Sequence, residues 1–228
     1  MSNIEAVINQ QGYVTVKQGD MQKNISFKDF LNVLAQMDES IQSDSTVNFI
    51  KYPTSVHSVA KTQRGYLMTM YFPETEADLV AYDTTYTTYI PNVIIQVELM
   101  RIQGQDGSFA IGTLRWYATD KTRGELRHDW QPSSTNHIWT LPFPNMYSNA
   151  SMCIGGNVLP SVIYSDWTVL DMLYTDVFLG SAFNNDLSIH SLNSSYSGID
   201  PDDWLSSLEN YYNEEDTTRF PYERLRDY

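Results

Sequence analysis

The chemistry open to this chain centres on its single cysteine, Cys153. A lone thiol makes no internal disulfide and no Cys-x-x-Cys pair for zinc binding or redox work. It can still be a small buried apolar side chain, a metal ligand with other partners, or a nucleophile. The nucleophile is favoured, because Pro144 and Asn145 stand shortly before Cys153 and the residues between them are typical of turns.

A cysteine that carries an acyl group must be reachable, so it belongs on an irregular segment rather than inside a strand. It also needs a donor for the oxyanion that develops during transfer, and the amide of Asn145 is a suitable one. Gly155 and Gly156 leave the backbone after Cys153 uncrowded, so the terminus of another chain can approach closely. Residues 142–156 therefore hold the parts of an acyl-transfer site.

This segment resembles the active site of ubiquitin-conjugating enzymes, where His-Pro-Asn, a short turn and the cysteine follow one another. Phe143, Pro144 and Asn145 fall on the tripeptide, and Cys153 falls on the cysteine that accepts the modifier as a thioester. Two positions depart from the pattern: Phe143 replaces the histidine, and Ala150 replaces the usual turn glycine. No Lys or Arg adjoins Cys153, so an inert cysteine in a scaffold of the same shape is the alternative.

Most of the chain, over residues 10–190, is also similar to the PRTRC system protein B family, a divergent bacterial branch carried on plasmids and mobile elements. That family has a "Pro-Phe-x-Asn-x-Tyr/Trp…Cys-x-Gly" segment followed by an aromatic-rich helix. The matching residues here are Pro142-Phe143-Pro144-Asn145-Met146-Tyr147, Cys153-Ile154-Gly155 and Phe178-Leu179-Gly180-Ser181-Ala182-Phe183.

The resemblance implies a ubiquitin-conjugating-enzyme-like α+β fold, an antiparallel sheet with flanking helices. It also implies that Cys153 takes the C-terminal glycine of a ubiquitin-like modifier from an activating enzyme, and that Asn145 stabilises the oxyanion during transfer to an amine. The residues that support the motif are Phe143, Pro144, Tyr147, Gly155 and Gly156. The reaction requires no metal or other cofactor from this chain.

The order of predicted elements is itself α+β. Two strands are expected within residues 4–17, then a helix that begins at Ser26, and further strands at 47–52, 65–72, 79–83, 93–102, 109–117 and 137–141. Gly104, Asp106 and Gly107 predict a hairpin turn. A helix is expected over residues 167–183, capped by Asp166 or Ser165, with Val169, Leu170, Leu173, Val177 and Phe178 on its apolar face.

Three parts follow from this order: an N-terminal strand-helix lobe (1–45), the conjugating-enzyme-like domain (46–197) and an acidic aromatic tail (198–228). The tail carries nine acidic and three basic residues. Its aromatic residues can dock a partner, through Trp204, Tyr211, Tyr212 and Phe220. Alternatively, a helix over about 203–212 packs on the chain's own core.

The formal net charge of −14 argues against general nucleic-acid binding, which needs Lys and Arg gathered on one face. No apolar run approaches the roughly 20 residues of a membrane span. The first residues lack a signal peptide, and with the single cysteine this predicts a cytoplasmic protein. The second function that the sequence allows is a non-catalytic binding or assembly module of a plasmid or phage system with the same fold.

Overall fold

The structure is a computed structural model that describes residues 4–8, 13–18, 21–26, 50–127, 137–184, 186–214 and 219–225. The chain forms two compact units, Met1–Asn48 and Phe49–Tyr228. The predicted α+β class is confirmed, since antiparallel sheets dominate and few helices accompany them. None of the helices in the described residues is long and apolar enough to cross a membrane.

The first unit holds a three-stranded antiparallel sheet. Its strands are β1 (Ile4–Ile8), β2 (Tyr13–Gln18) and β3 (Met21–Ser26). The first two strands match the prediction, whereas β3 was not predicted. The helix expected to begin at Ser26 lies outside the described residues.

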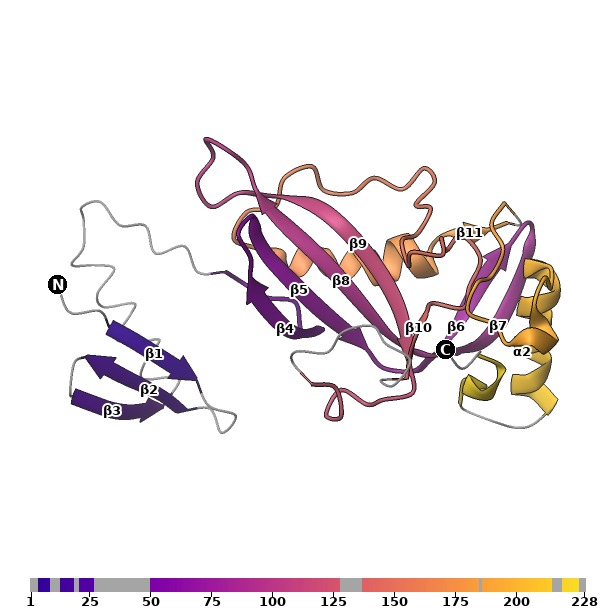
Figure 1. Ribbon diagram of the computed structural model, residues 1–228, viewed down its shortest axis with the longest axis horizontal. Coiled ribbons are helices and arrows are strands. Elements are labelled where there is room, and N and C mark those ends of the chain that lie inside the picture. Colours follow the sequence, from indigo (N-terminus) through magenta and orange to yellow (C-terminus); the bar gives the residue numbers. More distant parts are fainter. Residues whose placement is uncertain are drawn as a thin grey trace. The chain divides into compact units, whose positions relative to one another are not determined.

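The second unit is built on a five-stranded sheet (Figure 1), in the order β10-β9-β8-β5-β4 with every pair antiparallel. The strand prediction missed β4 and placed β5 correctly. The predicted turn between β8 and β9 is present, with Gly104 and Gly107 both at positive φ. The strands are β4 (Val56–Lys61), β5 (Gly65–Phe72), β8 (Asn92–Arg101), β9 (Phe109–Thr119) and β10 (Ile138–Thr140).

Central strand β8 is buried on both faces near its start. Its alternate residues Val93, Ile95 and Val97 join the main core, whereas Ile94 points the other way into a smaller cluster. That smaller cluster contains Tyr71, Ile94, Tyr117, Leu126, Ile138 and Ala150. Because successive side chains of a strand alternate between faces, one strand supports two apolar layers.

A helical segment lies against the main-core face of this sheet (Figure 1). It consists of the 3-10 helix η2 (Trp167–Asp171) and the π-helix η3 (Leu173–Leu179). The carboxylate of Asp166 caps it by accepting from the backbone N–H of Thr168, as the sequence predicted. The prediction was wrong for its end, which is Leu179, and for Val169, which is 40% exposed. A 3-10 turn has three residues rather than 3.6, which rotates Val169 off the buried face.

A second sheet of order β11-β6-β7 stands beside the first. It contains β6 (Thr75–Ala81), β7 (Thr84–Ile90) and β11 (Ala182–Phe183), and β11 runs parallel to β6. The strand predicted over 79–83 is wrong in its bounds, because Tyr82 and Asp83 turn the β6–β7 hairpin. Tyr82 has a positive φ of 51°, and no glycine or asparagine marks that turn in the sequence.

The described part of the C-terminal segment belongs to the second unit. Helix α2 (Pro201–Glu214) packs on β7, with Trp204, Leu205 and Leu208 buried at helical spacing. Two short 3-10 helices, η4 (Ser194–Tyr196) and η5 (Tyr222–Arg224), flank it.

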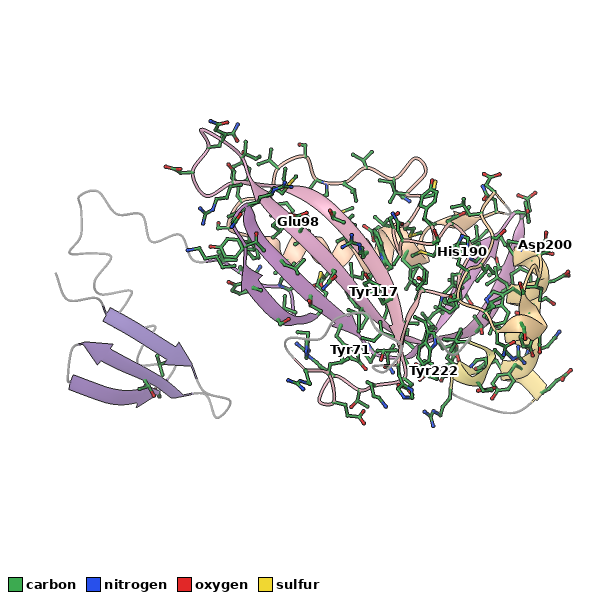
Figure 2. All side chains as sticks on the ribbon, viewed as in Figure 1. Tyr71, Glu98, Tyr117, His190, Asp200 and Tyr222 are labelled. Carbon is green, nitrogen blue, oxygen red and sulfur yellow. The ribbon has the colours of Figure 1, made fainter. Side chains whose placement is uncertain are left out.

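Tyr222 anchors the end of the chain to the large sheet. Its hydroxyl accepts a hydrogen bond from the backbone N–H of Asn92 (2.9 Å), and the Tyr71 hydroxyl donates to the Asn92 side chain (2.6 Å). Figure 2 shows Tyr71 and Tyr222 near each other at one end of the sheet. Burial raises the pKa of Tyr71 to about 12, so its hydroxyl remains a donor.

Candidate active site

Cys153 lies on one arm of a short hairpin that leaves the end of β10. The backbone N–H of Cys153 donates to the carbonyl of Asn145 (2.7 Å), and Tyr147 N–H donates to the carbonyl of Ser151 (2.8 Å). Met146 and Met152 pair between these two contacts. Both methionines are buried and Cys153 is exposed. The hairpin therefore holds the thiol on its outer face.

Phe143 anchors the entry to this hairpin. Its ring is fully buried and contacts Phe178, Phe183 and Phe220, at centroid distances of 5.5, 6.3 and 6.2 Å. The preceding carbonyl, of Pro142, accepts a hydrogen bond from the Trp204 indole (2.8 Å). Phe143, which stands in place of a histidine, thus fixes the segment by apolar packing.

Asn145 has a positive φ of 66°, a conformation that asparagine tolerates better than most residues. Its side-chain amide donates to the carbonyl of Ala182 (3.1 Å), which ties the hairpin to β11. The NH₂ group has two hydrogens, so one N–H remains for another acceptor. Asn145 also lines the cleft beside Cys153.

Ala150 makes the tip of the hairpin. It has a positive φ of 64°, so the position is one that glycine usually fills. Its methyl group is buried in the smaller cluster against Tyr71 and Tyr117, and its carbonyl accepts from the backbone N–H of Trp116 (2.8 Å). Burial of the methyl group offsets part of the backbone strain, which explains why alanine is accommodated here.

A cleft of about 450 Å³ opens beside the thiol. Gly155 and Gly156 line one side, and a Cβ atom added to either would meet nothing within 4 Å. Gly155 has a positive φ of 54°, which glycine adopts freely. The space next to these two residues is open.

The turn and strand that follow η3 also contribute to the lining of the cleft. Ser181, Ala182, Asn184 and Asp186 line it. Sequence reasoning did not place these residues at the site, which the hydrogen bond from Asn145 to the Ala182 carbonyl joins to the cysteine hairpin. Of the described residues lining the cleft, Asp186 alone carries a charge. Across the described residues, no three His, Cys, Asp or Glu side chains gather as a metal site.

Tyr147 also lines the cleft, with 42% of its surface exposed. Interaction with the neighbouring Cys153 thiol raises the pKa of Tyr147 above its ordinary value. Five of the residues predicted from the motif, Asn145, Tyr147, Cys153, Gly155 and Gly156, therefore meet at one cleft. Phe143 and Pro144 lie buried beneath it.

The predicted partner-binding residues are engaged elsewhere. Trp204 and Phe220 are buried in the main core, so the expectation that they dock a partner conflicts with their packing. Tyr211 lies under the Arg224 guanidinium, and Tyr212 donates its hydroxyl to Glu76. The alternative prediction, a terminal helix on the chain's own core, describes α2.

Comparison with protein families shows to which family this chain belongs. The model of prokaryotic E2 family D matches residues 55–228, the part that holds the large sheet, the cleft and α2. The chain belongs to this family. No curated protein and no solved structure matches the chain. Family D membership agrees with the conjugating-enzyme-like fold that the cysteine motif implied.

Proposed function

We propose that this family D protein carries a ubiquitin-like modifier as a thioester on Cys153 and transfers it to an amine. The observation that carries the proposal is the exposed Cys153 at the mouth of a cleft whose glycine side is unobstructed. We further infer that it is of the PRTRC system protein B type, encoded on a plasmid or other mobile element and working in the cytoplasm with an activating enzyme.

The reaction has two steps, which share one nucleophilic centre. The Cys153 thiolate attacks the carbonyl carbon of the modifier's C-terminal glycine, and the activating enzyme's thiolate leaves. An acceptor amine then attacks the same carbon and the C–N bond forms. The C–S bond breaks with its electron pair returning to the Cys153 sulfur, and the proton of the attacking amine passes to water.

Two polar groups of the cleft suit these steps. The free N–H of the Asn145 amide is the proposed donor to the oxyanion of each tetrahedral intermediate, while its other N–H holds Ala182. The Asp186 carboxylate, which lines the cleft, attracts a cationic amine into it.

The test is to trap the modifier on the protein. The full chain, its cognate activating enzyme, a ubiquitin-like modifier and ATP are incubated, and adducts are resolved with and without a thiol reductant. Wild type should form an adduct that the reductant releases. Cys153→Lys should form one that survives it, because an amide replaces the thioester, and Cys153→Ala should form none.

An adduct that persists unchanged in Cys153→Ala would place the acyl group on another residue. Absence of any adduct with a modifier-loaded activating enzyme would overturn the enzymatic proposal.

A further inference from the structure

Tyr147 and Cys153 are diagonal neighbours on the outer face of the hairpin. Asn145 pairs with Cys153, Met146 with Met152, and Tyr147 with Ser151. Alternation sends the Met146–Met152 pair inward, and Tyr147 and Cys153, one on each side of this pair, are both exposed. Residues two positions apart across such a ladder lie within reach of an aromatic side chain. The backbone register itself therefore brings the phenol to the thiol.

The other hydroxyl and amide groups of the cleft donate within the chain. Asn145 donates to the Ala182 carbonyl, and the Ser181 hydroxyl donates to the Val177 carbonyl. The amide of Asn184 donates to Asp186, and that of Asn157 donates to Ser181. The described lining of the cleft contains no positive charge. Tyr147 is the exposed lining side chain that stands diagonally across the hairpin from the Cys153 thiol.

We propose that Tyr147 is a catalytic residue whose phenol donates a hydrogen bond to the Cys153 sulfur whenever that sulfur carries negative charge. This inference rests on the proposed function and deepens it. It assigns to a neutral donor the task that a nearby Lys, Arg or His⁺ performs at other reactive cysteines. The raised pKa of Tyr147 agrees with this role, since the phenol keeps its proton at neutral pH.

Tyr147 acts on the Cys153 sulfur in both steps of the reaction, when the thiolate attacks and when it leaves. Before modifier transfer to Cys153, the hydrogen bond favours the thiolate that attacks the carbonyl. During discharge, negative charge builds on sulfur as the C–S bond breaks, and the same hydrogen bond stabilises the departing thiolate. The phenol keeps its proton throughout, so Tyr147 adds no further bond formation or cleavage to the two steps. Asn145 acts on the carbonyl oxygen, which makes the two contributions separable.

The experiment is the pH profile of iodoacetamide alkylation of the native full-length protein, followed by intact mass. Because the chain has one cysteine, the profile reports Cys153 alone. In Tyr147→Phe we expect the midpoint of the profile to move up by roughly one pH unit, as loss of a hydrogen bond to a charged group predicts. The midpoint is used because the absolute rate also changes with the nucleophilicity of the thiolate.

Tyr164→Phe is the matched control, because Tyr164 is 63% exposed and does not line the cleft. Its midpoint should equal that of wild type, and the tryptophan emission of both variants should match the native protein. A midpoint in Tyr147→Phe that equals wild type overturns the assignment of Tyr147. A shifted midpoint without any trapped modifier supports the assignment and counts against the conjugation proposal alone.

Discussion

The cysteine hairpin and the C-terminal segment both carry residues that the sequence marked as functional, but their surroundings differ. Cys153, Tyr147 and the two glycines face an open cleft, whereas Trp204 and Phe220 fill the core. A segment of aromatic and acidic residues is compatible either with a tail that docks a partner or with a helix that packs on the chain's own core. Trp204, Leu205 and Leu208 are spaced to lie on one face of a helix. This spacing distinguishes a helix that packs on the core from a docking tail.

The two regions are nevertheless in contact, since the Phe143 ring packs against Phe220 of the C-terminal segment. The Trp204 indole donates to the Pro142 carbonyl, just before the buried Phe143 that anchors the hairpin. The C-terminal helix therefore supports the site without taking part in its chemistry. The comparison predicts that changes in the C-terminal segment alter stability, and that changes on the hairpin face alter reactivity.

The largest stability effect is expected from Trp204→Ala. Removal of this fully buried ring should lower the free energy of unfolding by about 3–5 kcal/mol, since it leaves a cavity and an unpaired Pro142 carbonyl. Urea unfolding followed by tryptophan fluorescence measures this, because all five tryptophans lie in the second unit.

Two controls complete the Trp204 comparison. Tyr164→Ala, at an exposed aromatic residue, and Cys153→Ser should each stay within about 0.5 kcal/mol of wild type. If Trp204→Ala unfolds at the same urea concentration as Tyr164→Ala, the C-terminal helix is not part of the core and the contrast between the regions fails.

A smaller effect is expected from Glu74→Gln, at the contact between the C-terminal segment and β6. Glu74 accepts a hydrogen bond from the backbone N–H of Phe220, but burial outweighs this and raises the pKa of Glu74 above its ordinary value of 4.5. The stability that the carboxyl contributes is then complete below that ordinary value and is lost as pH rises through the folded-state pKa.

Because glutamine does not titrate, Glu74→Gln should gain stability relative to wild type as pH rises from about 4 to 7. Urea unfolding of both proteins across this range measures the difference. A difference that shrinks with rising pH would mean that the folded chain favours the charged carboxylate at this contact.

How much of the structure could be predicted from the sequence depended on how far apart in the sequence the interacting residues lie. The strand β5, the glycine turn before β9 and the grouping of Asn145, Tyr147 and Cys153 were accessible, because each is set by local sequence. The place of Ser181 and Asp186 in the cleft was not, since it depends on long-range contacts of β11. Asn145 donates to the Ala182 carbonyl, and β11 pairs with a strand about a hundred residues earlier.

The errors have two different causes. The strand predicted over 79–83 ran into the β6–β7 turn, because Tyr82 is a strand-forming residue type and neither glycine nor asparagine stands there. For the C-terminal aromatic residues the sequence allowed two alternatives, partner docking or packing on the core. Their burial depends on residues that are distant in sequence, so the sequence did not decide between them.

The most direct test of the central claim presents Cys153 with a small acyl donor. A peptide that ends in Gly-Gly, prepared as its mercaptoethanesulfonate thioester, is added to the native protein, and the intact mass is followed over time. We predict a single acyl adduct that hydroxylamine releases, that is absent in Cys153→Ser, and that forms faster than in the urea-unfolded chain. A native Cys153 that stays unmodified while the unfolded chain reacts would contradict the account.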